Sequence, residues 1–388
     1  MRLGVIVSSL GALLTAHQAV AAPINIPSNT WVGVRSPAVY QGACPNGQCK
    51  HIRVIHNPTD GRIYWLGGDY TSEDGFPQSG TNELWSYSIA GNDWRLEVDY
   101  CNPPGFIQPS HPDEVGFAFD TRRNKFWMYP GFQYNPDTQC QSTEVYQKVM
   151  SYDVPSRTWA VPNLTWTYYH TRFSQYDAVG DRMLMFDYDG GSILEHNLTT
   201  NVTRRINTIV PPGEGAGSAF IGWAWTAYDP VGRNIYVLCP SRGQLYRYNL
   251  DTNVMKFMCN TPVTGPDEQM LFWDPVNHVL LYPHRRDRGQ TEIAGPVRLF
   301  VWRESAPTTW SEIAITPPVD MQGNPLRDTA GNPVEVKGRV GVFDPIERVM
   351  LITGFDSQDT VPYMFLYRFA DGPVDAVAPS PPTNLRPR

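Results

Sequence analysis

The sequence lacks several features that would assign the protein to a common functional class. After the first 22 residues no stretch is long or apolar enough to cross a bilayer, and no sustained helical period is present. Basic residues are not in excess, because 31 Lys and Arg stand against 38 Asp and Glu, for a formal net charge of −7. We therefore expect no membrane span in the mature chain and no nucleic acid as partner.

The familiar catalytic signatures are also missing. The chain contains no G-x-S-x-G, no H-E-x-x-H, no phosphate-binding loop, no dinucleotide fingerprint and no sialidase-type Asp box. No pattern specifies a cofactor or a resident metal. The sequence leaves open whether the protein is an enzyme.

The N-terminus has the pattern of an export signal. Arg2 is followed by an apolar run from Leu3 to Leu14 and by small residues at Ala19–Ala22. The run is too short to span a bilayer, which disfavours the alternative of an uncleaved anchor. We predict a signal peptide at residues 1–22 and a secreted or periplasmic protein.

Cysteine is scarce, with six in the chain. Export would place them in an oxidising compartment, where disulfides are the expected state. The close spacing of Cys44 and Cys49 does not predict a zinc site, because no second pair lies beside it. We predict three disulfides near one face of the protein, namely Cys44–Cys49, Cys101–Cys140 and Cys239–Cys259.

Aromatic residues, glycine and proline are abundant. The 20 Tyr, 16 Phe, 12 Trp, 35 Pro and 32 Gly suit many short strands joined by tight turns. One turn pattern occurs six times, with Asp or Asn between two apolar strands and an aromatic residue or His directly before it. The Asp or Asn residues are Asn57, Asp120, Asp177, Asp229, Asp274 and Asp344. We call these six the register residues, and their recurrence predicts a repeat protein.

The stretch from Arg62 to Trp94 shows the repeat best. An apolar strand ends in Gly67 and Gly68, a polar loop follows, and a second strand carries Trp85 and Tyr87 before a tight turn. This pattern resembles a kelch repeat, and the resemblance implies one blade of a β-propeller.

We therefore predict an all-β fold, a six-bladed propeller over residues 28–370 followed by a Pro-rich tail at 371–388. The last blade lacks a fourth strand, and Ser28–Val32 would supply it and close the ring. A seventh blade is the alternative if residues 311–338 contain two strands. The recurring aromatic residues Tyr87, Tyr152, Tyr248, Trp94 and Trp159 are assigned to the core.

The long loops of this arrangement emerge on one face, which is where binding chemistry is expected. Residues before each inner strand would surround a central pit on that face. The predicted catalytic residues are His51, His111, Tyr169, His170 and Arg172. The predicted substrate-binding residues are Glu114, Trp223, His284, Arg285 and Arg339.

This set suits an acidic glycan. An arginine would neutralise a uronate carboxylate while His or Tyr removes the neighbouring proton, which is the chemistry of a polysaccharide lyase. Trp223 and Tyr169 would stack on sugar rings.

Three other interpretations remain open. The propeller could be a monomeric, non-catalytic platform for a protein ligand, as many kelch propellers are. It could hold a metal through His51, His111 and His170, although the ligand pattern of galactose oxidase, a kelch-like copper enzyme, is not visible. The same residues could also be solvated loop positions.

Overall fold

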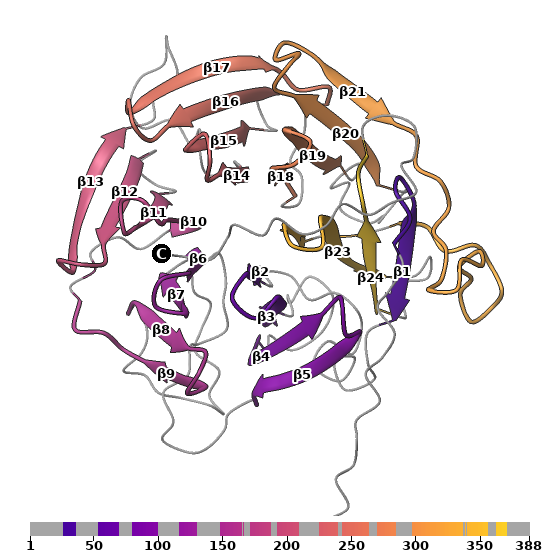
Figure 1. Cartoon of the computed structure of the whole chain (residues 1–388), viewed down its shortest axis with the longest axis horizontal. Coiled ribbons are helices and arrows are strands. Elements are labelled where there is room, and N and C mark those ends of the chain that lie inside the picture. Colours follow the sequence, from indigo (N-terminus) through magenta and orange to yellow (C-terminus); the bar gives the residue numbers. More distant parts are fainter. Residues whose placement is uncertain are drawn as a thin grey trace, which may run out of the picture.

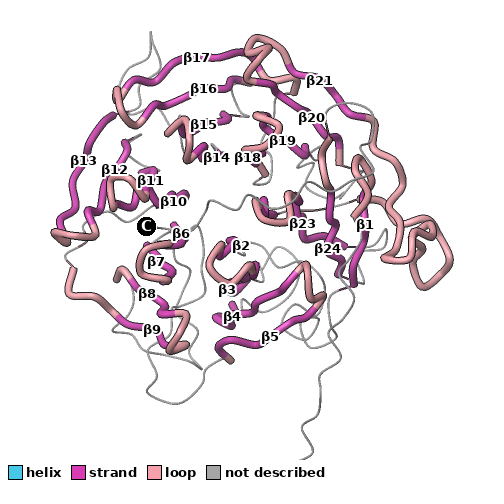
Figure 2. The backbone as a smooth tube through the Cα atoms, viewed as in Figure 1, coloured by secondary structure: helices cyan, strands magenta, loops and turns pink. Residues whose placement is uncertain are grey.

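The computed structural model describes residues 26–35, 53–69, 80–99, 116–129, 148–164, 166, 171–187, 192–208, 225–239, 243–263, 270–284, 297–336, 338, 340–355 and 362–370. These ranges contain strands and turns and no helix, so none offers a helix that could cross a membrane. Figure 2 shows the strands grouped in sheets around a common centre, with the strands of each sheet following one another outward.

Six antiparallel sheets of four strands form the blades of a β-propeller (Figure 1). Blade 1 holds β2 (Arg53–Asn57), β3 (Arg62–Asp69), β4 (Gly80–Ser88) and β5 (Asp93–Val98). Blade 2 holds β6 (Gly116–Asp120), β7 (Lys125–Tyr129), β8 (Met150–Asp153) and β9 (Thr158–Ala160). Blade 3 holds β10 (Thr171–Asp177), β11 (Arg182–Asp187), β12 (Ser192–Asn197) and β13 (Val202–Thr208). Blade 4 holds β14 (Trp225–Asp229), β15 (Asn234–Cys239), β16 (Gln244–Asn249) and β17 (Val254–Asn260). Blade 5 holds β18 (Phe272–Asp274), β19 (Val279–His284), β20 (Arg298–Arg303) and β21 (Trp310–Ile313). Blade 6 holds β22 (Val340–Asp344), β23 (Val349–Phe355), β24 (Pro362–Tyr367) and β1 (Trp31–Arg35).

The predicted all-β, six-bladed fold is confirmed, and so is its closure. β1 pairs antiparallel with β24, from Trp31 opposite Tyr367 to Arg35 opposite Tyr363. The N-terminal strand thus becomes the outermost strand of the last blade, and contacts far apart in sequence lock the ring. The kelch resemblance itself stays a prediction.

The register residues form the turn after each inner strand. In blade 2, Asp120 Oδ1 accepts the backbone N–H groups of Arg122 and Arg123 at 2.9 and 3.0 Å. The residue four places after the register residue has a left-handed backbone in every blade, for example Asn124 at φ 53°. A short side-chain acceptor and a tolerated positive φ together define this turn, which explains why the pattern recurs.

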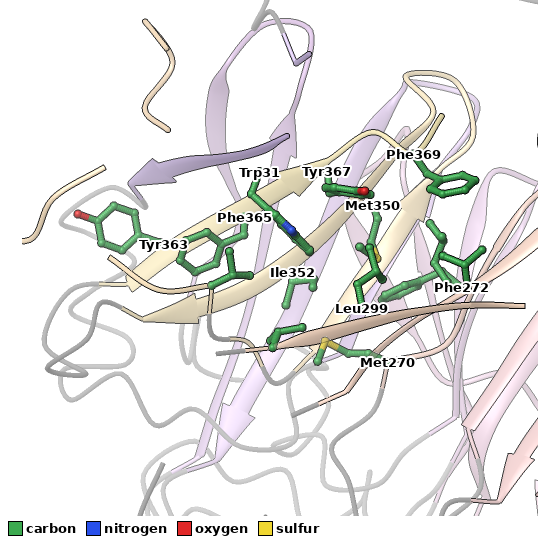
Figure 3. Packing of buried hydrophobic residues seen from close by; sticks show 14 of the residues in the cluster. Trp31, Met270, Phe272, Leu299, Met350, Ile352, Tyr363, Phe365, Tyr367 and Phe369 are labelled. Carbon is green, nitrogen blue, oxygen red and sulfur yellow. The ribbon is translucent and has the colours of Figure 1, made fainter. Parts of the chain in front are cut away.

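Apolar side chains fill the space between neighbouring blades. The cluster between blades 5 and 6 includes Trp31, Phe272, Leu299, Met350 and Tyr367, all buried (Figure 3). The Trp31 and Tyr367 ring centroids lie 4.7 Å apart, so the closing strand is anchored in the core.

The predicted core aromatics are buried as expected, with one partial exception. Tyr87, Tyr152, Tyr248 and Trp159 are buried, whereas Trp94 is half-buried against the cluster at blade 1.

The segment between β21 and β22 does not hide a seventh blade. It runs along the outer edge of β1, where Val319 N–H donates to Trp31 C=O at 2.9 Å and Gly33 N–H donates to Val319 C=O at 2.8 Å. Two D-x-x-G-N turns follow, at 320–324 and 328–332. This segment therefore reinforces the closing strand at the rim of the ring (orange in Figure 1).

The predicted Cys239–Cys259 disulfide is wrong, because both thiols are free and buried. Cys239 is on β15 and Cys259 on β17, and β16 lies between them. Two strand spacings give about 9.6 Å, beyond the reach of a disulfide. The two side chains also pack in different clusters, Cys239 toward blade 3 and Cys259 toward blade 5. The other four cysteines lie outside the described residues.

Candidate functional site

The six inner strands surround a central channel with a volume of about 460 Å³. The lining comes from β2, β6, β10, β14, β18 and β22 and from the turns that follow them. The volume is in the range of small-molecule sites in proteins. The channel is therefore the candidate site that the described residues form.

A ring of six residues lines the channel near its turn end. Every blade contributes the residue directly before its register residue. These residues are His56, Phe119, Tyr176, Tyr228, Trp273 and Phe343. The sequence showed this recurrence but used it only to set the register, so the aromatic ring is the part of the site that sequence reasoning missed.

Backbone groups supply polarity to the same wall. Each inner strand has a sheet neighbour on one side only, and its other edge faces the channel. In an antiparallel pair, alternate residues direct their N–H and C=O groups away from the partner strand. Within the described strands, six such edges add hydrogen-bond donors and acceptors to the channel wall.

Few polar side chains line the channel away from its turn end. Arg53, at the start of β2, is buried with 8% of its surface exposed, and Gln175 on β10 is half-buried. The hydroxyl oxygens of Ser174 and Thr226 are enclosed by protein and have no hydrogen-bond partner. Arg53 and Gln175 are thus the two long polar side chains on the inner strands that line the channel away from its turn end.

One pair of ionisable groups lies at the seam between blades 1 and 6. His56 Nε2 is 3.2 Å from Asp344 Oδ1, without hydrogen-bond geometry, and both side chains are buried. Burial lowers the pKa of His56 to about 4, against the opposing effect of Asp60. Burial raises the pKa of Asp344 to about 6, against the backbone N–H groups of Glu347 and Ile346. Both shifts favour the uncharged forms.

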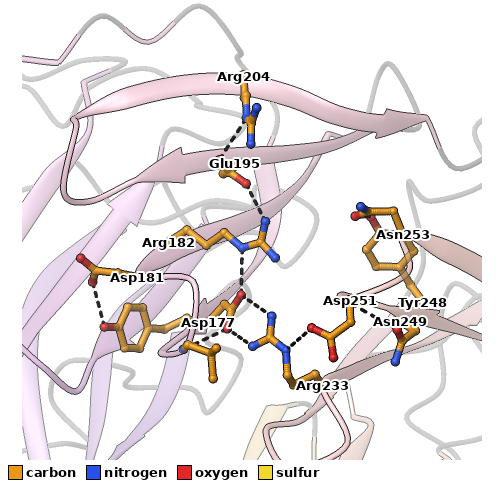
Figure 4. A network of polar contacts seen from close by, with 12 residues as sticks. Asp177, Asp181, Arg182, Glu195, Arg204, Arg233, Tyr248, Asn249, Asp251 and Asn253 are labelled. Atoms are coloured by element: carbon orange, nitrogen blue, oxygen red, sulfur yellow. Dashed lines mark hydrogen bonds and ion pairs between the residues drawn. The ribbon is translucent and has the colours of Figure 1, made fainter.

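The corresponding acid in blade 3, Asp177, is neutralised by neighbouring arginines (Figure 4). Asp177 is fully buried and accepts hydrogen bonds from Arg182 at 2.8 Å and from Arg233, in blade 4, at 2.6 Å. Burial by itself would raise the pKa of Asp177, but the two arginines outweigh it and hold the pKa below its ordinary value. Such ion pairs between blades fix the channel wall on the turn side.

Arg182 also carries this network outward through blade 3. It donates to Glu195 at 2.7 Å, and Arg204 on the outermost strand donates to the other oxygen of Glu195 at 3.1 Å. The buried charges are therefore balanced from β10 to β13, which gives the network a structural rather than a catalytic role.

Most of the predicted site residues lie outside the described residues. These are His51, His111, Glu114, Tyr169, His170, Trp223, Arg285 and Arg339. Arg172 is in β10, but its side chain is not described. In sequence they lie within a few residues of inner strands or strand ends, on the side opposite the register turns.

His284 differs from its predicted loop position. It ends β19, is buried, and its Nδ1 lies 3.2 Å from the Tyr282 hydroxyl. Its ring packs against Phe300 as well. The sheet extends further than the sequence predicted, so His284 is held inside blade 5 rather than in the loop.

No group of three His, Cys, Asp or Glu side chains among the described residues is arranged to hold a metal ion. The proposed histidine ligands His51, His111 and His170 all lie outside that part of the chain.

No known protein family model matches this chain, and no curated protein matches it in sequence. Among solved structures it is similar to an auxiliary nutrient binding protein from Bacteroides thetaiotaomicron VPI-5482, with a TM-score of 0.48 and 10% identity. The match covers 81% of this chain and 68% of that one. A similarity of this size carries no argument about function.

Proposed function

We propose that the protein binds an extracellular carbohydrate in its central channel. The observation that carries the proposal is the composition of the channel wall, which combines five aromatic residues and His56 with the free backbone edges of six strands. Sugars present apolar C–H faces and polar hydroxyl rims, and such a wall offers partners for both.

Arg53 favours an acidic sugar over a neutral one. Arg53 lines the channel at the start of β2, on a strand that follows the predicted residue His51. An arginine in a water-poor site binds a carboxylate through charge-assisted hydrogen bonds. The ligand class we propose is therefore a uronate-containing glycan.

Isothermal titration calorimetry with matched neutral and uronate-containing oligosaccharides tests this proposal. We expect binding of the uronate series, at least about tenfold tighter than binding of neutral sugars of the same length. Absence of heat with every saccharide, at protein concentrations that detect millimolar affinity, would remove carbohydrate as the ligand class.

The sharper form of the proposal is an eliminating enzyme. A base, His170 or His51, would take the proton next to the uronate carboxylate, the bond to the leaving oxygen would break, and Tyr169 or a second His would protonate that oxygen. Arg172 would stabilise the charge that develops on the carboxylate. The electron pair of the broken C–H bond becomes the new carbon–carbon double bond.

Ultraviolet absorbance of the unsaturated product measures this reaction directly. We expect absorbance to rise with a uronate polymer, and the rise to fall at least about a hundredfold in His170→Ala and Arg172→Ala. A flat trace with a glycan that binds by calorimetry would leave a binding protein and eliminate the lyase.

A further inference from the structure

The turn end of the channel is surrounded by exposed apolar side chains. Two places after the register residue, four adjacent blades carry Val179, Val231, Val276 and Ile346, which are 69, 82, 46 and 36% exposed. We call these four residues the apolar collar. They are half of the eight large hydrophobic side chains that are exposed in the described chain, so the collar is a concentration rather than a scatter.

The turn itself does not require apolar residues there. In blades 1 and 2 the same position is Thr59 and Arg122, and their backbone N–H groups bond to Asn57 and Asp120 in the usual way. A polar side chain is therefore compatible with the fold at this position. The valines and the isoleucine expose apolar surface that folding does not demand.

Proline extends the apolar surface to the channel. The residues one place after the register residue line the turn-side mouth, and they include Pro230, Pro275 and Pro345 beside three members of the collar. At the first two places after the register residue, blades 3 to 6 carry only apolar residues, which we call the apolar rim, whereas blades 1 and 2 include Thr59, Thr121 and Arg122.

The described chain ends beside this rim. β24 runs in the same direction as β22, so Phe369 and Ala370 emerge on the turn face. The Phe369 carbonyl accepts a hydrogen bond at 3.3 Å from Asn277, the residue after Val276 of the collar. Ala370 is held by Asn29, which donates to its C=O at 3.0 Å and accepts from its N–H at 3.1 Å.

The residues that follow match the rim in chemistry and in reach. Residues 371–388 include five prolines together with Val374, Val377 and Leu385, and the stretch from 374 to 382 carries a single charge, at Asp375. Eighteen residues in polyproline II conformation span about 56 Å. Packed sheets lie about 10 Å apart, so blade 3 is within about 30 Å of the point where the tail begins.

We propose that residues 371–388 dock on the apolar collar. A proline-rich segment loses little conformational entropy when it binds an apolar rim. This proposal is independent of what the channel binds.

Photochemical cross-linking tests the docking. Val377 is replaced by p-benzoylphenylalanine in the purified protein, which is irradiated and digested with trypsin, and the cross-linked peptides are identified by mass spectrometry. Val377 lies seven residues after Ala370, about 22 Å in polyproline II, so we expect cross-links within one chain to the peptides that hold Val231 and Val276. The yield should fall by about tenfold when both valines are replaced by serine.

Val202→Ser with Val254→Ser is the matched control. These valines are 54 and 56% exposed and begin the outermost strands of blades 3 and 4, away from the channel mouth. The control should keep the full cross-link yield. Cross-links between two chains would show that a second copy covers the collar. That result, the absence of cross-links to the collar, or a yield unchanged by the collar substitutions would overturn the proposal.

Discussion

At the scale of single residues, His56 and Asp344 are exceptions within a repeated pattern. Five blades place an aromatic residue where blade 1 has His56. Asp177 has arginine partners for its carboxylate, whereas Asp344 Oδ2 has no hydrogen-bond partner. The two exceptions face each other at 3.2 Å. The described interface between blades 1 and 6 thus holds one facing pair of His and Asp side chains.

The pH dependence of the two groups has opposite signs. His56 has its pKa lowered to about 4, so its contribution to stability is present above its ordinary pKa of 6.5 and is lost as pH falls toward 4. Asp344 has its pKa raised from 3.8 to about 6, so its contribution is present below pH 3.8 and is lost as pH rises through 6. In the natural protein the two trends oppose each other between pH 4 and 6.5.

Replacing either residue should therefore leave only the pH dependence that the other residue gives to the free energy of unfolding. His56→Phe introduces the residue that blades 2 and 6 have at this position. The free energy of unfolding of this variant, relative to that of the natural protein, should rise by on the order of 2 kcal/mol as pH falls from 7 to 5. Asp344→Asn, which copies Asn57 of blade 1, should show the opposite slope. Urea unfolding at several pH values measures both, and identical slopes in the two variants would contradict the titration of this pair.

At the scale of the elements, the turn after each inner strand connects neighbouring blades. Arg233 occupies a left-handed position in blade 4 with φ 51°, and its side chain reaches Asp177 in blade 3. Arg348 occupies the same position in blade 6 with φ 58°, but its Nε has no hydrogen-bond partner.

The two arginines make a matched pair for substitution. Arg233→Ala removes one of two charged partners from a fully buried carboxylate and should lower the free energy of unfolding by about 2–3 kcal/mol. Arg348→Ala carries the same backbone penalty and should lower it by less than about 1 kcal/mol. Chemical denaturation of both variants gives the comparison, and equal losses would contradict a stabilising role for the Arg233–Asp177 pair.

The sequence predicted the strands and turns that recur in every blade. It did not predict the structure of segments that occur only once in the chain. Every register turn obeys one geometry, an Asx acceptor followed by a left-handed residue, so six copies specified six blades and the closing strand. The segment at 311–338 occurs once, and nothing in its sequence indicated that it would pair with β1 at Val319. The predicted Cys239–Cys259 bond failed because proximity to strand ends does not tell which side of the sheet a thiol faces.

The channel wall also combines residues that repeat from blade to blade with residues that occur in one blade only. The aromatic ring of the channel was visible as a repeat, because each blade supplies one residue at one position. Polar residues such as Arg53 and Gln175 occur in single blades, so no pattern separates them from surface residues.

At the scale of the whole molecule, six sheets close into a ring and create a site that no single blade contains. Five inner strands contribute an aromatic residue and the sixth contributes His56, each strand adds one free backbone edge, and only the closed ring brings the six together around about 460 Å³. The proposed ligand site is the channel, and the blades hold the strands that form its wall.

Blocking the channel is the most direct test of this account. Gln175 lines the channel and is half-buried, so Gln175→Trp would fill the space between the inner strands. Val202→Trp adds the same ring to an exposed position on the outermost strand of the same blade. With the oligosaccharide that binds best in calorimetry, we expect Gln175→Trp to weaken binding by at least about tenfold and Val202→Trp to leave it unchanged. Unchanged binding by a folded Gln175→Trp protein would contradict a ligand in the channel.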